Sequence, residues 1–266
     1  MRIYSSLLIF PYLLISVFRT EAQDNLSQAQ WIDLTYPFSE KTLYWPNNPK
    51  GFTKDTLFEG MTTKGYYYSS YGFYAPEHGG THLDAPVHFV RGKLTVDKIP
   101  LDKLTGEAVV IDVSNKAASN RDYLIKVDDV TNWEKQNGLL PDGVIILFRT
   151  GYGKYYPDPL LYFGTDQKGE EAIPALHFPG IHPELAYWLV KKRKIKAVGI
   201  DTPSIDYGQS DEFLTHRVLL AENIPAFENV AHLDLLPLKN IYVVALPMLL
   251  KDGSGAPLRI IACVTK

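Results

Sequence analysis

The chain has 266 residues, of which 45% are hydrophobic and 21% are charged, and its formal net charge is −3 at pH 7. This composition is ordinary for a globular protein and excludes a disordered or fibrous chain. The mildly acidic balance also lacks the basic surface that nucleic acids and anionic membranes require, so neither is expected as a partner. One basic run, 191–194, follows a predicted helix and is interpreted as a solvated helix end.

Residues 1–22 have the features of an export signal. Arg2 supplies the positive start, residues 7–18 form a short apolar run, and Thr20-Glu21-Ala22 provides a cleavage site before Gln23. This run is shorter than the ~20 residues that span a bilayer, and Pro11 interrupts it. We therefore expect cleavage, a secreted or lumenal location, no membrane association afterwards, and a formal charge that changes from −3 to −4.

A polar tail, residues 23–30, follows the signal and is expected to fray. It carries the sequon Asn25-Leu26-Ser27, where glycosylation is left open. At the other end of the chain lies the single cysteine, Cys263, so an intramolecular disulfide is excluded. Its apolar strand-like surroundings predict a buried, inert thiol.

The remaining residues, 31–266, are predicted to form one α/β domain. Short segments rich in Val, Ile and Tyr predict strands at 31–35, 66–74, 107–113, 143–148, 196–200, 240–246 and 258–264. Helices are predicted at 127–136, 183–192 and 212–222. Because these elements mix without clean βαβ alternation, we expect a central mixed sheet. The stretch 152–179, rich in Gly, Pro and Tyr, is interpreted as a long functional loop.

Chemistry concentrates in the segment 78–88, HGGTHLDAPVH, which holds three of the seven histidines. On an extended segment His82 and Asp84 share one face, and Gly79-Gly80 gives the backbone freedom to bring His78 round by a turn. Two imidazoles and a carboxylate suit Zn, Mn or Fe, and one carboxylate can bridge two metals. His88 can then remain without a metal and transfer protons.

The alternatives are a structural role for these histidines and another class of catalytic motif. An isolated histidine pair is more often structural, whereas three histidines and an aspartate on a Gly-Gly turn favour a site. Because glycines and a proline flank the segment, it lacks the helical context of H-E-x-x-H and is a poor match to that class of metalloprotease. The sequence has no G-x-S-x-G nucleophile elbow, no P-loop and no dinucleotide fingerprint.

The segment resembles the H-x-G-T-H-x-D-x-P-x-H signature of the cyclase family, which includes bacterial-type kynurenine formamidase and isatin hydrolase. Every fixed position of the signature is met. The resemblance runs from about Ile32 to the C-terminus. It includes Trp45-Pro46, the segment 199–206, and the pair His216 and Glu228. It implies a metal-dependent amidohydrolase on a swivelling β/β/α fold that is usually oligomeric and acts on a small molecule.

The resemblance also implies roles for individual residues. His78, His82 and Asp84 would bind one divalent metal, Zn²⁺ or Mn²⁺. Asp84 would share a second metal, where present, with His216 and Glu228. From the residues themselves, the alternative partner for the Glu228 carboxylate is an arginine such as Arg217.

Two further roles are carried over from the family. His88 would act as general acid/base, taking a proton from the nucleophile and delivering it to the leaving nitrogen. Trp45 would line the substrate pocket. A bound divalent ion would lower the pKa of water toward ~7 and polarise the scissile carbonyl.

Other acidic and histidine side chains have weaker claims. Asp201 and Asp206 are either partners that orient a metal-bound histidine or caps of a loop, with no preference between the two. His177, His182 and His232 are interpreted as structural.

The substrate stays open at the level of sequence. The first interpretation is an arylformamidase-like enzyme of tryptophan catabolism that converts N-formylkynurenine to kynurenine and formate, although export fits a cytosolic pathway poorly. The alternative is hydrolysis of a cyclic amide or lactone such as an isatin-like compound. A binding protein that has lost turnover is the third, but an acid/base histidine has no purpose there.

Overall fold

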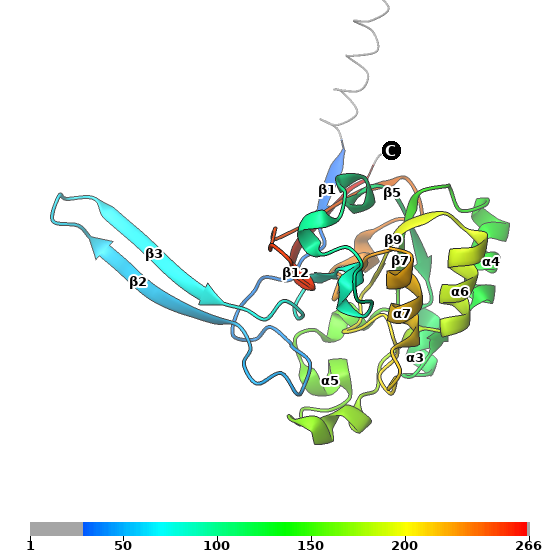
Figure 1. Cartoon of the computed structure of the whole chain (residues 1–266), viewed down its shortest axis with the longest axis horizontal. Helices are drawn as coiled ribbons and strands as arrows, with labels where there is room; N and C mark the ends of the chain where they lie inside the picture. The colour runs from blue at the N-terminus through cyan, green and yellow to red at the C-terminus, as the bar shows by residue number, and fades with distance from the viewer. Residues whose placement is uncertain (1–28, 265–266) are drawn as a thin grey trace, which may run out of the picture.

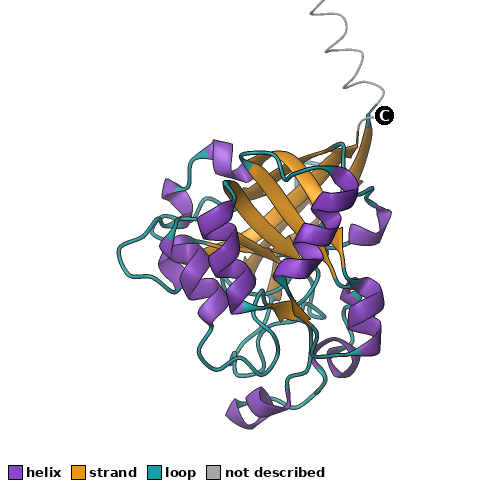
Figure 2. Ribbon diagram, turned by 90° about the vertical axis from the view of Figure 1, so that its right-hand side faces the viewer, coloured by secondary structure: helices purple, strands orange, loops and turns teal. Residues whose placement is uncertain are grey.

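The computed structural model describes residues 29–264, so the export signal, the sequon at Asn25 and most of the polar tail lie outside the described residues. Between these limits the chain forms a central sheet with helices on its flanks (Figures 1 and 2), and one long hairpin projects from it (Figure 1). No helix in residues 29–264 is long and apolar enough to cross a membrane.

The central sheet has eight strands and closes on itself like a barrel. Its order is β1-β12-β11-β5-β7-β9-β10-β4, and β4 also pairs with β12. The strands are β1 (Gln30–Asp33), β4 (His82–Asp84), β5 (Thr105–Asp112), β7 (Val144–Arg149), β9 (Ile195–Ile200), β10 (Ala226–Glu228), β11 (Ile241–Pro247) and β12 (Gly255–Val264).

Half of this sheet is parallel and half is antiparallel, which confirms the predicted mixed α/β architecture. β5, β7, β9 and β10 run parallel to one another. All pairings of β1, β4, β11 and β12 are antiparallel, including those of β11 with β5 and of β4 with β10. The expected lack of βαβ alternation is wrong for the parallel half. There α4 (Val127–Asn137), α6 (Pro183–Lys192) and α7 (Leu214–Ala221) each connect two consecutive strands.

Two apolar cores follow from side-chain alternation along the strands. In β5, Ala108 and Val110 belong to the core that the closed sheet encloses, whereas Val109 and Ile111 belong to the core under the helices. The parallel strands are thus buried on both faces, as parallel sheets require. β1, β12 and β11 are different, because none of their residues belongs to the core under the helices.

The smaller elements were mostly not predicted. They are the hairpin β2 (Thr53–Met61) and β3 (Tyr67–Tyr74), the pair β6 (Leu124–Ile125) and β8 (Gly180–Ile181), the helices α2 (Leu101–Leu104), α3 (Ser114–Ser119) and α5 (Pro159–Phe163), and the 3₁₀ turns η1 (Pro86–His88), η2 (Val96–Lys98), η3 (Tyr152–Tyr155), η4 (Glu170–Ala175) and η5 (Leu233–Leu235). Of these, only β3 had been expected as a strand. The predicted long loop 152–179 is wrong as an unstructured segment, because η3, α5 and η4 divide it.

Two sequence interpretations outside the site are settled by packing. The basic run 191–194 is only partly a solvated helix end, because Arg193 donates two hydrogen bonds to Glu134, whose side chain is buried. Cys263 is buried and unpaired, as predicted.

Candidate metal centre

The signature segment becomes a turn followed by a strand that closes the barrel. Gly79 and Gly80 have φ values of +148° and +57°, a backbone region that side chains rarely adopt. At Gly79 a Cβ would also lie only 2.1 Å from the ring of Tyr44, so the close approach requires glycine. The turn carries His78 back over β4, where His82 and Asp84 lie two residues apart on one face.

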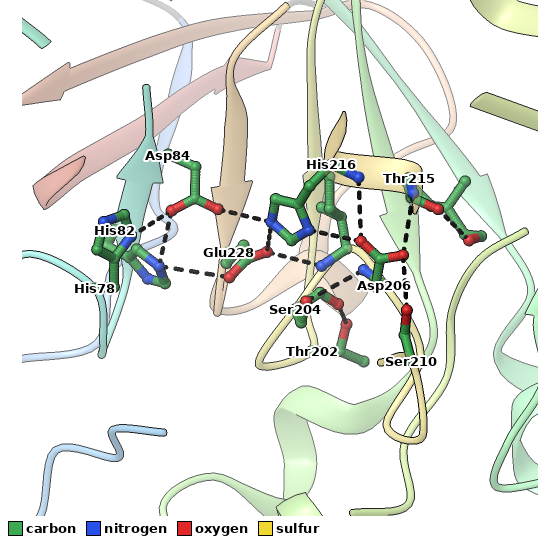
Figure 3. A network of polar contacts seen from close by, with 12 residues as sticks. His78, His82, Asp84, Thr202, Ser204, Asp206, Ser210, Thr215, His216 and Glu228 are labelled. Atoms are coloured by element: carbon green, nitrogen blue, oxygen red, sulfur yellow. Dashed lines mark hydrogen bonds and ion pairs between the residues drawn. The ribbon is translucent and has the colours of Figure 1, made fainter. Parts of the chain in front are cut away.

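The remaining members of the cluster come from the neighbouring strand and helix. Glu228 ends β10 and lies directly opposite His82 in the antiparallel register. His216 lies in the first turn of α7 and points toward the same place (Figure 3). Five side chains thus meet, as two groups that share Asp84, and in each group the possible ligand atoms lie within 4.8 Å of one another. The predicted approach of His216 and Glu228 to Asp84 is met.

Asp84 is the centre of this network. Its Oδ1 lies 2.6 Å from His78 Nδ1 and 3.3 Å from His82 Nε2, and its Oδ2 lies 3.0 Å from His216 Nε2. Glu228 completes the ring, with its two oxygens 3.4 Å from His82 Nε2 and 3.1 Å from His216 Nε2. The suggested alternative is wrong, since Arg217 contacts the carbonyl of Glu212 and not Glu228.

In each of the three cluster histidines, the ring nitrogen that faces away from Asp84 also has a hydrogen-bond partner. His82 Nδ1 donates to the carbonyl of Gly80 at 3.0 Å, because a carbonyl can only accept. His216 Nδ1 faces Asp206 at 2.6 Å. His78 Nε2 lies 2.9 Å from the hydroxyl of Ser254, whose only proton is donated to Glu77 at 2.6 Å, so His78 must donate here.

The positions of these ring protons indicate whether the cluster can bind a cation. With one ring nitrogen of His78, His82 and His216 used as a donor, the other nitrogen of each turns a lone pair toward carboxylate oxygens. An imidazole lone pair and a carboxylate oxygen repel each other at these distances, so the arrangement requires a positive charge between them. Three imidazoles and two carboxylates are also the donor set that divalent Zn or Mn accepts. The residues present therefore fit one or two divalent metals.

The pKa values show the same excess of negative charge. Burial lowers the pKa of His82, but Asp84 and Glu228 outweigh burial and raise it to about 9. Burial also opposes ionisation of Asp84, yet the surrounding imidazoles hold its pKa well below the ordinary value. Burial, and then the nearby Asp84, raise the pKa of Glu228. Two buried carboxylates with oxygens within 4.8 Å of each other thus draw protons onto the imidazoles wherever no metal supplies the charge.

His88 lies next to the cluster but outside both ligand groups. It ends η1, and its ring stacks on that of His78 with a centroid distance of 3.7 Å. Burial lowers its pKa to about 3, and the neighbouring imidazoles add to this against the pull of Asp84. His88 is therefore neutral near pH 7.

The cluster forms one wall of a cavity of about 220 Å³. Trp45, which was predicted to line the pocket, lies on its wall together with Leu43, Tyr44, Phe89, Phe163 and Phe213. Phe213 has the left-handed backbone conformation, with φ of +49°, which is strained for a bulky side chain. Its ring lies between those of Phe89, at 5.2 Å, and Trp45, at 6.4 Å.

The structure also resolves the two aspartates that the sequence left undecided. Asp206 holds His216 and also accepts from the backbone N–H groups of Thr215 and His216 at the start of α7, so it both orients the imidazole and caps the helix. Asp201 accepts from Thr150 and Gly151 and contacts no histidine, which is the loop-capping role. His177, His182 and His232 lie outside the cluster, as interpreted.

Two residues were not found by sequence reasoning: Ser254, which contacts His78, and Glu77, which accepts a hydrogen bond from Ser254. Glu77 is adjacent to the signature and could have been considered on that ground. Ser254 lies 176 residues from His78, and no local pattern marks it.

Comparison with known proteins agrees with this geometry. The family model described as "Putative cyclase" matches residues 32–207. The chain belongs to the cyclase family. Isatin hydrolase of Roseibium aggregatum is 31% identical over 198 residues, which cover 71% of this chain and 73% of that protein. Kynurenine formamidase of Bacillus cytotoxicus is 29% identical over 240 residues, which cover 89% and 98%.

Solved structures place the fold in the same family. The crystal structure of an isatin hydrolase bound to the product analogue thioisatinate superposes with a TM-score of 0.82 at 25% identity, covering 97% of this chain and all of that chain. The protein is thus a metal-dependent hydrolase of the cyclase family, related to isatin hydrolase and kynurenine formamidase. The predicted resemblance and the predicted fold class are confirmed.

We expect Asp206→Asn to weaken metal binding by about 10- to 100-fold, because an oriented imidazole loses the carboxylate that fixes its ring. The metal dissociation constant, measured by competition with a chelator, checks this. Asp211→Asn, an exposed change on the same loop, serves as the control and is expected to leave the constant unchanged. Equal affinity of Asp206→Asn and wild type would show that Asp206 only caps α7.

Proposed function

We propose that this protein is a secreted hydrolase that cleaves the C–N bond of a small aromatic amide with one or two divalent ions, Zn²⁺ or Mn²⁺. The observation that carries the proposal is the buried cluster of three histidines and two carboxylates at the wall of an aromatic cavity. His78, His82 and Asp84 hold the first ion, and Asp84, His216 and Glu228 hold the second. A bound divalent ion supplies Lewis acidity, which acidifies water and polarises the amide carbonyl.

The protein's own side chains then handle the protons and the substrate. His88 is neutral, lies in the cavity wall and has no ligand role, so it accepts the proton of the attacking water and passes it to the leaving nitrogen. Its stacking on His78 holds the ring within reach of the cluster. Trp45, Phe89 and Phe213 contact the aromatic part of the substrate.

The character of the cavity favours an uncharged ring amide over N-formylkynurenine. Among the described residues that line it, none is a lysine or arginine that could pair with the carboxylate of an amino acid substrate. Burying an unpaired carboxylate there would be costly. We therefore place an isatin-like cyclic amide first and the arylformamidase activity of tryptophan catabolism second. The second is supported by the similarity to kynurenine formamidase over nearly all of that protein.

Hydrolysis by the purified, metal-loaded protein tests the assignment. We expect turnover of isatin, slower turnover of formanilide, and the weakest of N-formylkynurenine, followed by absorbance and by liquid chromatography. Adding a chelator is expected to stop each reaction. N-formylkynurenine as the best substrate would reverse the order of the two activities, and binding of all three without turnover would identify a binding protein that has lost catalysis.

Secretion is the other part of the proposal, and it rests on the features of residues 1–22. Expression in a secreting host is expected to give a protein in the medium whose N-terminal residue is Gln23, measured by intact mass. Recovery of the chain with Met1 in place would contradict both cleavage and the secreted location.

A further inference from the structure

Asn229 directly follows the ligand Glu228, and the mechanism above gives it no role. It lines the cavity but does not belong to either ligand group. Its side chain is nevertheless buried, with 3% of the residue exposed. Its backbone has the left-handed conformation, with φ of +52°, which asparagine tolerates better than most residues. A buried amide at such a position needs hydrogen-bond partners, and these partners indicate what the residue does.

Two hydrogen bonds of opposite direction join Asn229 to the turn of the signature segment. Its Nδ2 donates to the carbonyl of Gly80 at 2.7 Å, and the hydroxyl of Thr81 donates to its own backbone carbonyl at 2.7 Å. Gly80 and Thr81 are buried as well, so water does not compete for either bond. We call this pair of hydrogen bonds the clamp.

The clamp acts on the same carbonyl that orients His82. The Gly80 carbonyl also accepts from His82 Nδ1 at 3.0 Å, and a carbonyl oxygen has two lone pairs, so these two donors fill it. The other ring nitrogen of His82 faces Asp84 and Glu228. The direction of the Gly80 carbonyl therefore decides where the free lone pair of His82 points, and Asn229 helps to set that direction.

Asn229 is itself anchored on the side away from the turn. The hydroxyl of the fully buried Tyr162 donates to Asn229 Oδ1 at 2.8 Å, and the Asn229 backbone N–H donates to the carbonyl of Thr202 at 3.0 Å. Only an N–H can donate to the Gly80 carbonyl, so the amide oxygen must be the atom that faces Tyr162. The partners on both sides thus define one orientation of the amide.

The pairing of the strands does not require the clamp. The antiparallel ladder between β4 and β10 ends with His82 opposite Glu228, and Thr81 and Asn229 lie one residue beyond this last pair. The clamp is therefore an addition to the ladder, placed where the chain enters β4 and leaves β10. Each of its two sides is adjacent in sequence to one ligand, because Thr81 precedes His82 and Asn229 follows Glu228.

We propose that Asn229 is a positioning residue, which through the clamp holds His82, a ligand of the first group, against Glu228, a ligand of the second. This inference rests on the proposed metal-dependent function, because it concerns how the ligands are placed for the ion. Asn229 acts through the Gly80 carbonyl, and its Nδ2 already donates there, so it is not assigned a contact with the reacting atoms.

Metal affinity of the purified protein tests the clamp without any substrate. Asn229→Gly removes the amide and keeps the backbone conformation, because glycine adopts positive φ freely. Thr81→Val removes the other hydrogen bond at nearly constant shape, and Thr81→Ser keeps the hydroxyl. The dissociation constant of Zn²⁺ or Mn²⁺, whichever wild type binds more tightly, is measured by competition with a chelator. We expect it to rise about 10-fold in Asn229→Gly and Thr81→Val, and to stay near wild type in Thr81→Ser.

Two control variants separate positioning from general loosening. Asn240→Gly changes an exposed asparagine with the same left-handed backbone, φ of +62°, and is expected to leave the constant unchanged. Val130→Ala opens a cavity in the core under the helices, so it is expected to lower the melting temperature of the metal-free protein but not the metal affinity. If Asn229→Gly is unfolded by circular dichroism, the comparison of Thr81→Val with Thr81→Ser decides.

Unchanged affinity in the clamp variants, or an equal loss in Val130→Ala, would overturn the inference, because the clamp would then serve stability alone. Failure of Thr81→Ser to retain affinity would overturn it as well. These outcomes leave the proposed function intact. A wild-type protein that binds neither ion would instead contradict the proposed function and, with it, this inference.

Discussion

Asp84→Asn is expected to remove bound metal from the protein and to lower the hydrolysis rate by at least about 10⁴-fold, the largest effect of any single change at the site. Asp84 belongs to both ligand groups, and its two oxygens face His78, His82 and His216. The amide cannot carry the charge that holds a divalent ion between three imidazoles. Metal content by elemental analysis and turnover of the best substrate are expected to fall together.

A carboxylate far from the cluster controls for charge alone. Asp142 is exposed and pairs with Lys194, far from the cluster, so Asp142→Asn is expected to keep both metal and activity. If Asp84→Asn retains wild-type metal content, the ligand assignment fails, whatever happens to the rate.

His88→Ala, unlike Asp84→Asn, is expected to keep its bound metal but to lose activity. His88 lies outside both ligand groups, so metal content is expected to stay near wild type. Turnover is expected to fall by about 10²- to 10⁴-fold, the usual contribution of a positioned acid/base group. Elemental analysis and kcat measured on the same preparation separate the two effects.

His182→Ala provides the matched histidine control. This side chain accepts from the N–H of Glu184 at the start of α6 and lies outside the cluster, so its loss is expected to lower stability slightly and leave kcat unchanged. If His88→Ala loses as much metal as Asp84→Asn, His88 is a ligand and the proton-transfer role is wrong. Unchanged kcat with full metal content would also exclude that role.

Which parts of the molecule could be predicted depends on how local the signal is. The strands β5, β7, β9, β11 and β12 are apolar runs, and the helices α4 and α6 have capping signals, so each was found to within a few residues. β10 was missed because it has only three residues, and β2 because its polar and apolar residues do not alternate. The closing of the sheet through β4 depends on pairing between distant segments, which no local pattern encodes.

The same distinction holds for the metal centre. His78, His82, Asp84 and His88 were found because one short segment contains them, with glycines where the turn requires them. Trp45, His216 and Glu228 came only from the family resemblance, because they are distant in sequence. Ser254 and Phe89 act through contacts that exist only after folding, and the backbone strain at Phe213 has no counterpart in its residue type.

The short strand β4 must pair with its neighbours in one register, because its two faces have different functions. His82 and Asp84 face the cluster, while Leu83 between them is fully buried in the barrel interior with Phe227 opposite. A slip of one residue would exchange these faces, placing a carboxylate in the apolar interior and a leucine among the ligands. The misaligned barrel could not bind a cation, so metal binding favours only the correct closure. A bound ion thus favours the correct alignment of this strand, and selection for catalysis also preserves the register of β4.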